Sequence, residues 1–236
     1  MVADLLAELV SAPRLAAILL DVDGVLAPIV ERPELARVPD ETRGELRRLC
    51  GRYGLLACVT GRPSAEAARI VGVSGLQIVG EHGLELAPDA ADWTERLASF
   101  AAGVDWPAER KPLTVSFHFR RRDDEAAARA YLDRVSTWAR EAGLVPRYGR
   151  KVLEVRPPVA ADKGTAVRAL LEQARLGRAL YAGDDATDLD AFAALTGLEL
   201  AIKVAVDSAE APAGLRETAD LVVDGPPGML ELLRTL

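Results

Sequence analysis

The sequence predicts an α/β protein in which a doubly wound parallel sheet is interrupted by a smaller, inserted α+β module. Short aliphatic runs without polar alternation, at residues 16–21, 54–60, 76–80 and 178–185, are typical of strands that are covered on both faces. Helical patterns lie between these runs, and such alternation of strand and helix is typical of a parallel sheet with helices on both faces. The middle of the chain follows a different pattern, which marks the insert.

The parallel part is expected to contain more elements than these four strands. Helical patterns separate the strands and close the chain, and two later aliphatic runs extend the sheet. The expected helices are 40–53, 63–72, 162–177 and 228–236, and the additional strands are 198–204 and 219–224.

The insert is expected to fold as an antiparallel sheet with helices. Between residues 113 and 120, apolar and polar side chains alternate, as in a strand with one face in water. The other elements expected in the insert are helices 92–104 and 124–143 and a hairpin of strands 144–148 and 151–157. We therefore expect a discontinuous core domain of residues 1–86 and 158–236, and an inserted α+β domain of residues 87–157.

Composition and charge argue against several classes of function. The chain has 236 residues, half of them hydrophobic, and a net charge of −7, so a nucleic-acid partner is not expected. No apolar run reaches the ~20 residues of a membrane span, and the acidic N-terminal segment does not resemble a signal peptide. Cys58 lies in an apolar run, where a buried thiol is expected rather than a disulfide with Cys50. A cytoplasmic protein of enzyme size is expected, and its oligomeric state is not specified.

Polar residues follow the expected parallel strands at the points where these strands end. Asp21 and Asp23 come after the first strand, Thr60 and Gly61 after the second, and Asp184 after the fourth. Ligands of open α/β sheets bind outside the carboxyl ends of the strands. These residues are therefore expected to meet in one crevice.

The aspartates of this crevice predict a divalent cation. Asp21, Asp23 and Asp184 carry three negative charges, and unit charges about 4 Å apart repel by ~4 kcal/mol at an effective dielectric constant of 20. Mg²⁺ is suited to a few carboxylates together with phosphate oxygens. With Lys163 as a further positive charge, the pattern indicates phosphoryl transfer.

Several of these residues also have a purely structural interpretation. Asp162 is a natural N-cap, which puts Lys163 in a first helical turn, where a solvated lysine and an anion ligand are equally supported. Thr60 is as compatible with a plain turn as with a phosphate contact. Acids between residues 184 and 190 can cap a helix, but four acids there exceed this need, so at least one is expected to bind the metal.

The two histidines of the chain do not predict a zinc site. His82 and His118 have no third histidine and no paired cysteines beside them in the sequence. Each is expected to be a polar packing residue or a substrate contact.

Four motifs, taken in order, resemble those of the haloacid-dehalogenase-type phosphatases. They are LLDVDGVLAP (19–28), CVTGRPS (58–64), DKGTAV (162–167) and GDDATD (183–188). The segments GEHGLEL (80–86), KPLTVSFHFR (111–120) and GRKVLEVRP (149–157) further resemble trehalose-6-phosphate phosphatases. The resemblance extends from about residue 15 to the C-terminus, and it implies a Rossmann-like core with a mobile cap between the second and third motifs.

The resemblance implies a Mg²⁺-dependent phosphatase that hydrolyses trehalose 6-phosphate through an aspartyl-phosphate. Asp21 would be the nucleophile, and Asp23 would act as general acid and then as general base. Mg²⁺ would be held by the Asp21 carboxylate, the Asp23 backbone carbonyl and Asp184, with Asp188 in support. The residues implied to bind the phosphoryl oxygens are Thr60 and Lys163, and those implied to bind the sugar phosphate are Gly61, Arg62, His118, Arg120, Arg150, Lys151 and Glu154.

Departures from the family pattern keep other functions open. Leu189 stands where trehalose-6-phosphate phosphatases usually have glutamate, so the alternative substrate is another glycosyl or pseudo-disaccharide phosphate. A phosphomutase would have to protect its phospho-enzyme from water. A non-catalytic sugar-phosphate sensor is a further alternative, although a sensor has no need of a nucleophile at Asp21.

Overall fold

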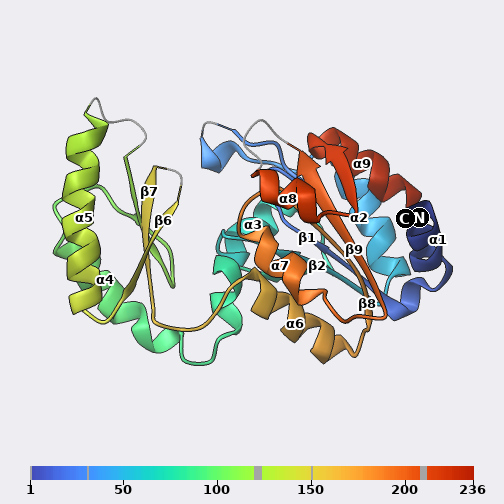
Figure 1. Ribbon diagram of the computed structural model, residues 1–236, viewed down its shortest axis with the longest axis horizontal. Helices are drawn as coiled ribbons and strands as arrows, with labels where there is room; N and C mark the ends of the chain where they lie inside the picture. The colour runs from blue at the N-terminus through green and yellow to red at the C-terminus, as the bar shows by residue number, and fades with distance from the viewer. Residues whose placement is uncertain (1, 31, 120–123, 150, 208–211) are drawn as a thin grey trace. The chain divides into compact units, whose positions relative to one another are not determined.

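The chain folds into two compact units (Figure 1). The computed structural model describes residues 2–30, 32–119, 124–149, 151–207 and 212–236. Unit 1 consists of Met1–Gly83 and Ala161–Leu236, and unit 2 is Leu84–Ala160. The boundaries predicted from the sequence, at residues 87 and 157, fall inside unit 2.

Unit 1 is built on a parallel sheet, as the continuous aliphatic runs predicted. Its strands, within the described residues, are β1 (Ala16–Leu20), β2 (Leu55–Val59), β3 (Gln77–Val79), β8 (Arg178–Gly183), β9 (Leu200–Asp207) and β10 (Leu221–Asp224). Their order in the sheet is β10-β9-β8-β1-β2-β3, and each neighbouring pair is parallel. The strand β1 therefore lies between β8 and β2, so the segments that follow these three strands are neighbours.

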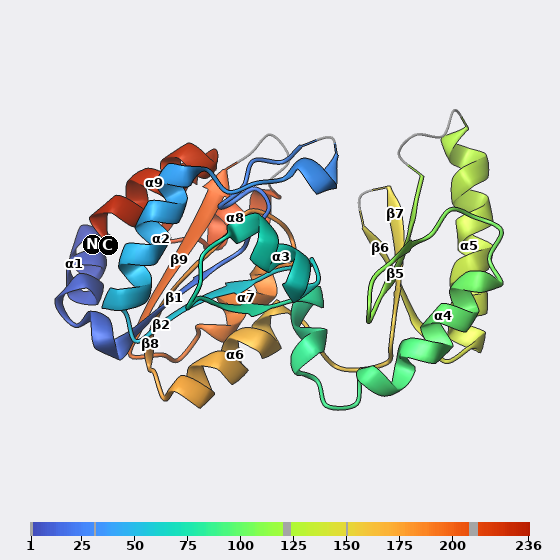
Figure 2. The ribbon, with the colours of Figure 1, turned by 180° about the vertical axis from the view of Figure 1, so that it is seen from behind.

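Helices cover both faces of this sheet, which explains why its strands are apolar throughout. The helices of unit 1 are α1 (Val2–Ser11), α2 (Asp40–Arg52), α3 (Ser64–Val71), α6 (Lys163–Ala174), α7 (Asp188–Ala194), α8 (Ala213–Thr218) and α9 (Gly225–Thr235). Side chains of α1, α2, α3 and α9 pack with Ile18 and Leu20 on one face. Those of α6, α7 and α8 pack with Ala17 and Leu19 on the other. The two groups of helices lie on opposite sides of the sheet (Figures 1 and 2). Among the described helices, none combines the length and apolarity needed to cross a membrane.

Unit 2 is an antiparallel sheet with helices on one face. Its elements in the described residues are α4 (Thr94–Ala102), β4 (Glu109–Arg110), β5 (Val115–His118), α5 (Glu125–Glu141), β6 (Val145–Gly149) and β7 (Val152–Arg156). The strand order is β4-β5-β7-β6. Phe117 and Leu153 are fully buried in a cluster with Leu97 of α4 and Leu132 of α5. The alternate side chains of β5 and β7 therefore face away from these helices.

Candidate active site

Three of the predicted site residues lie side by side at one edge of the unit 1 sheet. Asp184, Asp21 and Thr60 follow the adjacent strands β8, β1 and β2, and all three are buried. The Asp21 N–H continues the strand pairing by donating to the Ala182 carbonyl oxygen at 2.9 Å, and the Thr60 N–H donates to that of Val79 at 3.0 Å. The backbone of the sheet thus fixes where these side chains begin.

Lys163 completes the centre of this site. Its Nζ atom donates to Asp21 Oδ2 at 2.7 Å and to Asp188 Oδ1 at 2.8 Å, and the side chain is only 2% exposed. The structure thus excludes the solvated surface lysine that the sequence left open. Burial alone would lower the pKa of Lys163, but the carboxylates of Asp188 and Asp21 outweigh it and raise the pKa above its ordinary value. Lys163 is therefore a permanent cation next to Asp21.

Asp188 accepts hydrogen bonds from several groups of this site. Its Oδ1 atom also accepts the Tyr181 hydroxyl at 2.7 Å, and its Oδ2 atom accepts the N–H groups of Asp184 and Asp185, each at 3.0 Å. Burial raises the pKa of Tyr181, so its hydroxyl keeps its proton and acts as a donor. Because both oxygens of Asp188 are engaged, this fully buried carboxylate orients Lys163 and the Asp184 loop.

The geometry of the carboxylates suits a small cation. One oxygen from each of Asp21, Asp184 and Asp188 lies within 4.8 Å of the other two. Gly24 lets Asp184 approach the loop after β1, because a Cβ atom at Gly24 would lie 2.0 Å from Asp184 Oδ2. The φ angle of Gly24 is 76°, which also favours glycine. Carboxylate oxygens are among the ligands that Mg²⁺ prefers, and the Lys163 ammonium group lies beside two of these carboxylates.

The electrostatics of the site indicate the same cation. Burial raises the pKa of Asp21 well above its usual value, and Lys163 only partly opposes this effect. Burial, together with the charge of Asp188, raises the pKa of Asp184 to about 7. Carboxylates in this state gain a proton or bind a cation. The carboxylates of Asp21, Asp184 and Asp188 therefore fit a divalent cation.

Asp23 is paired with Arg62. The guanidinium donates from Nε to Asp23 Oδ2 at 2.6 Å and from its terminal nitrogen to Oδ1 at 2.7 Å, a bidentate arrangement. Arg62 also donates to the Pro33 carbonyl at 3.1 Å and pairs with Glu66. The hydrogen bond to Asp23 is the main reason that the pKa of Arg62 is raised. Arg62, predicted to bind substrate, here orients Asp23.

Two of the residues predicted to bind sugar, His118 and Glu154, lie on the sheet of unit 2. Glu154 of β7 is opposite Ser116 of β5, and His118 lies on the same face, away from the helices. The His118 ring is 2.6 Å from Glu109 Oε2, measured from Nε2. Polar groups that can bind hydroxyls therefore gather on one face of unit 2.

The other residues predicted to bind sugar in unit 2 are Lys151, Arg120 and Arg150. Lys151 precedes β7 with a φ angle of 55°, and its ammonium group pairs with Glu125 at the start of α5. Arg120 and Arg150 lie outside the described residues.

Sequence reasoning missed three residues that orient the predicted ones. Tyr181 holds Asp188, Glu66 pairs with Arg62, and Glu109 pairs with His118. The sequence contains a signal for the first two. Tyr181 is the only polar side chain between Ala179 and Gly183, and Glu66 follows Arg62 by four residues, a spacing typical of ion pairs on helices. Glu109 is brought to His118 by the antiparallel pairing of β4 with β5, and β4 was not predicted from the sequence.

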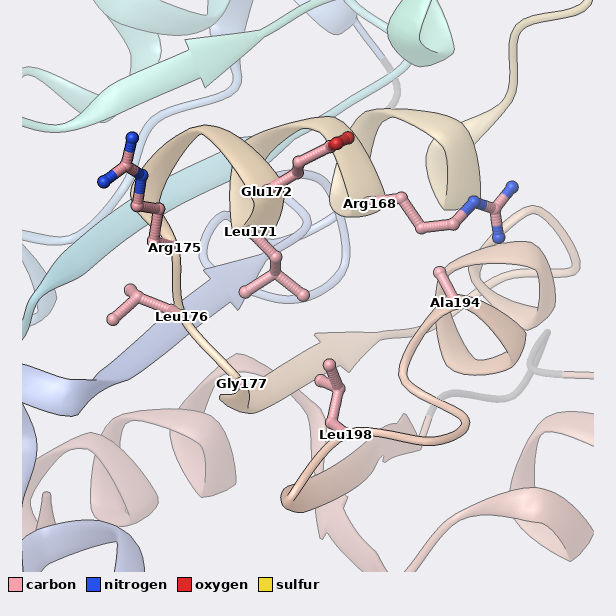
Figure 3. A pocket seen from close by; sticks show the side chains of 8 residues that line it. All are labelled: Arg168, Leu171, Glu172, Arg175, Leu176, Gly177, Ala194 and Leu198. Carbon is pink, nitrogen blue, oxygen red and sulfur yellow. The ribbon is translucent and has the colours of Figure 1, made fainter.

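A pocket of about 510 Å³ lies away from these residues (Figure 3). It is lined by Arg168, Leu171, Glu172, Arg175, Leu176, Gly177, Ala194 and Leu198. Leu171 and Leu198 point into it, and the arginines lie at its rim (Figure 3). This pocket is near the last turn of α6, whereas Lys163 begins the same helix. It shares no residue with the aspartate site.

The fold and the site together define a class of protein. A haloacid dehalogenase-like hydrolase from Bacteroides thetaiotaomicron has the same fold, with a TM-score of 0.63 at 14% identity, covering 93% of this chain and 98% of that structure. The C-terminal domain of the Candida albicans trehalose-6-phosphate phosphatase gives a TM-score of 0.75 at 22% identity, covering 99% of this chain and 96% of that structure. The chain has the haloacid dehalogenase-like phosphatase fold, with a second, antiparallel sheet.

Sequence similarity identifies the family within this class. The trehalose-phosphatase family model matches residues 19–108 and 107–222. A trehalose-phosphate phosphatase of Mycobacterium avium is 34% identical over 212 residues, which cover 79% of this chain and 53% of that protein. The chain belongs to the trehalose-phosphatase family. It spans about half the length of such relatives, and 16% of an uncharacterized glycosyl hydrolase of Mycobacterium tuberculosis that is 35% identical over 221 residues.

Proposed function

We propose that this chain is a Mg²⁺-dependent phosphatase that hydrolyses trehalose 6-phosphate to trehalose and phosphate in the cytoplasm. The observation that carries the proposal is the environment of Asp21. This buried carboxylate lies at a strand end, accepts a hydrogen bond from Lys163, and is close to the carboxylates of Asp184 and Asp188. Membership in the trehalose-phosphatase family supports the substrate.

The first step is attack by Asp21 on phosphorus. Asp21 attacks in its ionised form, which burial opposes and Lys163 favours, and a bound cation would favour it further. The Asp21 Oδ1 atom accepts the N–H of Val22 at 2.7 Å, which fixes the orientation of the carboxylate. A bond forms between an Asp21 oxygen and phosphorus while the bond to the sugar oxygen breaks. Lys163 and Thr60 bind the charged phosphoryl oxygens.

Asp23 moves the proton in both halves of the reaction. It gives a proton to the departing sugar oxygen, then takes one from the water that attacks the aspartyl-phosphate, which releases phosphate and regenerates Asp21. In this structure both Asp23 oxygens accept hydrogen bonds from Arg62. We therefore include in the proposal that Arg62 exchanges one of these bonds for the substrate.

The metal site and unit 2 have separate roles. Mg²⁺ held by Asp21, Asp184 and the Asp23 carbonyl would neutralise the carboxylates and draw charge from the phosphoryl group. Unit 2 serves as the cap, and its polar face, with His118 and Glu154, would bind sugar hydroxyls and exclude water. The core chemistry thus depends on unit 1, and the choice of sugar on unit 2.

Leu189 is the specific reason to keep another glycosyl phosphate as the second candidate. Where glutamate is usual in the family, this side chain is half-buried and packs against the hydrophobic cluster of α6, α7 and α8. It therefore contributes packing rather than a charge, which leaves fewer polar contacts for a particular sugar.

The test is phosphate release from trehalose 6-phosphate, sucrose 6-phosphate, glucose 6-phosphate and glucosyl-glycerate phosphate, each with Mg²⁺ and with EDTA. The proposal expects trehalose 6-phosphate to be hydrolysed orders of magnitude faster than the others, and EDTA to stop the reaction. A different leading sugar phosphate would move the assignment to the second candidate. Inactivity on the whole panel would reject these substrates and move the assignment to a substrate outside the panel or to a non-catalytic sensor.

A further inference from the structure

The turn Glu81–Gly83 lies beside the site and has a strained backbone. The mechanism proposed for Asp21 and Asp23 does not use it. Glu81, His82 and Gly83 all have left-handed backbone conformations, with φ angles of 48°, 55° and 94°. Residues with a Cβ atom rarely adopt this region, and such strain persists only where the surrounding structure holds it in place. Strained backbone of this kind concentrates at functional sites.

Backbone hydrogen bonds hold this turn against the loop after β2. The Glu81 N–H donates to the Arg62 carbonyl at 3.0 Å, and the His82 N–H donates to the Thr60 carbonyl at 2.9 Å. These two carbonyls flank Gly61, so the turn fixes the loop at both of its ends. The Glu81 side chain is fully buried, which anchors the turn in unit 1. The placement of the Thr60 hydroxyl therefore depends on the turn.

The ring of His82 lies directly on Gly61. A Cβ atom built on Gly61 would be 2.5 Å from His82 Nε2 and 2.6 Å from Cε1. Side chains do not approach each other this closely, so only glycine at position 61 leaves room for the ring in this place. The backbone of the loop and the His82 ring are thus in contact.

Gly83 connects the same turn to the helix that carries Lys163. A Cβ atom at Gly83 would be 2.7 Å from the Asp162 carbonyl oxygen. Asp162 caps α6, because its side chain accepts the Thr165 N–H at 2.7 Å in a capping box. Lys163 is the next residue along the chain. The turn therefore contacts both the Thr60 loop and the start of α6. The loop carries the Thr60 hydroxyl, and α6 carries the Lys163 ammonium group that is hydrogen-bonded to Asp21.

We propose that the Glu81–Gly83 turn is a positioning element that sets these two elements relative to each other, and that His82 is the positioning residue that acts on the loop through Gly61. The kinetic readout of this inference rests on the proposed phosphatase function. The inference is independent of the sugar, because the loop and α6 face the phosphoryl group. A loosened turn weakens binding of the transition state more than binding of the substrate.

The first test replaces His82 by asparagine and by glycine. Both residues accept a left-handed backbone, so the turn is kept and only the ring is lost. The expected result is a kcat lower by ~10–100-fold, the usual effect of removing a residue that orients a reactive one, with KM within about twofold. The factor should be the same for trehalose 6-phosphate and for p-nitrophenyl phosphate. Inhibition by orthovanadate, which adopts the five-coordinate geometry of phosphoryl transfer, should weaken in parallel.

Arg175 offers a matched control for the strain. It has the same φ angle of 55°, is exposed, and ends α6 far along the helix from Lys163. Arg175→Gly should leave kcat, KM and vanadate inhibition unchanged, with an equal or higher midpoint of thermal unfolding. If His82→Gly behaves in the same way as Arg175→Gly, the ring has a structural role only and the inference is overturned.

A double-mutant cycle tests the contact itself. Gly61→Ala displaces the His82 ring, whereas in the background of His82→Gly the new methyl group has space. The inference expects the loss of kcat in the double variant to be clearly smaller than the product of the two single losses. Independent, multiplicative losses would show that His82 does not act through Gly61.

The wild-type measurements separate failure of the inference from failure of the proposed function. Hydrolysis of p-nitrophenyl phosphate without hydrolysis of trehalose 6-phosphate rejects the sugar assignment, and the His82 comparison is then made with p-nitrophenyl phosphate and vanadate. A wild-type protein that neither turns over either compound nor binds vanadate rejects both proposals.

Discussion

Two lysines of this chain form ion pairs with carboxylates in opposite environments. Lys163 in unit 1 is 2% exposed and bridges Asp21 and Asp188, whereas Lys151 in unit 2 is 42% exposed and pairs with Glu125. Water solvates the charges of the second pair with or without its partner, whereas the buried charges of the first set depend on one another and on a few fixed donors such as the Tyr181 hydroxyl. Burial therefore makes the charges of unit 1 interdependent, while those of unit 2 act one by one.

The same contrast holds for carboxyl groups. Burial raises the pKa of Asp184 to about 7, whereas a hydrogen bond from the Tyr148 hydroxyl lowers the pKa of Asp133 in unit 2. The buried carboxylates Asp21, Asp184 and Asp188 of unit 1 have Lys163 as their nearby cation, so a further cation would stabilise their ionised forms. Asp133 of unit 2 is stabilised in its ionised form by Tyr148 and Arg129 instead.

The largest effect is expected from Asp21→Asn. The asparagine side chain has one acceptor oxygen in place of two, so it keeps only one of the hydrogen bonds from Lys163 and the Val22 N–H, and it cannot form an acyl phosphate. Turnover should therefore fall by ~10⁴-fold or more with the fold intact. Phosphate release and thermal unfolding measure the two expectations. Asp40→Asn, at an exposed ion pair on α2, should leave turnover unchanged. Near wild-type activity of the Asp21 variant would refute the assignment of the nucleophile.

Replacing Lys163 or Lys151 by methionine tests whether the buried ion pairs contribute more to the free energy of unfolding than the exposed pair. Lys163→Met leaves the buried carboxylates of Asp21 and Asp188 without their cation, and it should lower the free energy of unfolding by about 3–5 kcal/mol. Lys151→Met breaks an exposed pair and should change it by at most about 1 kcal/mol. Urea denaturation without metal gives both values. Equal losses would mean that burial does not decide the strength of these pairs.

The raised pKa of Asp184 predicts how stability and metal binding depend on pH. The unfolded carboxyl titrates near pH 3.9 and the folded one near 7, so the folded protein binds more protons between these values. Without metal, the free energy of unfolding should therefore decrease as pH rises from about 4 to 7. Mg²⁺ competes with the proton, so its dissociation constant should fall by about tenfold from pH 6 to pH 8 if one proton is displaced.

Calorimetry in buffers of different ionisation enthalpy measures this proton release. Asp133→Asn is the control, because that carboxyl already has a lowered pKa and should not alter the profile. Asp184→Asn should remove the pH dependence of Mg²⁺ binding together with most of the affinity. A dissociation constant that does not change between pH 6 and pH 8 would contradict the assignment of Asp184 as a ligand that is protonated without metal.

Much of unit 1 was predictable from the sequence because its signals are local. Four apolar runs gave four strands of a parallel sheet, and residues that follow such strands meet at one edge for topological reasons. The burial of Lys163 could not be predicted, since its position in a first helical turn is compatible with solvent. Its partner Asp21 is 142 positions away, and only the fold brings the two together.

Two elements are absent from the predicted set for different reasons. The helix α1 has an apolar pattern, but no helix was predicted there from the sequence. The strand β4 has two residues, which is too short for a periodic pattern. In the turn at Glu81–Gly83, His82 and Gly83 are residue types that are enriched in left-handed backbone but Glu81 is not, and the turn was not predicted from the sequence. Lys203, on β9 beside Tyr181, is half-buried, and nothing in the structure explains it.

The smallest effect is expected in unit 2, from Glu154→Gln. A charged hydrogen bond on a wet face contributes about 1 kcal/mol, because water replaces it when it is lost. This corresponds to a KM for trehalose 6-phosphate that is about fivefold higher, with kcat nearly unchanged. The KM for p-nitrophenyl phosphate, which has no sugar, should not change. Glu125→Gln, which removes an exposed carboxylate that pairs with Lys151, is the control and should alter neither value. If Glu154→Gln lowers kcat for both substrates equally, then this face of unit 2 contributes to the chemistry as well as to the choice of sugar.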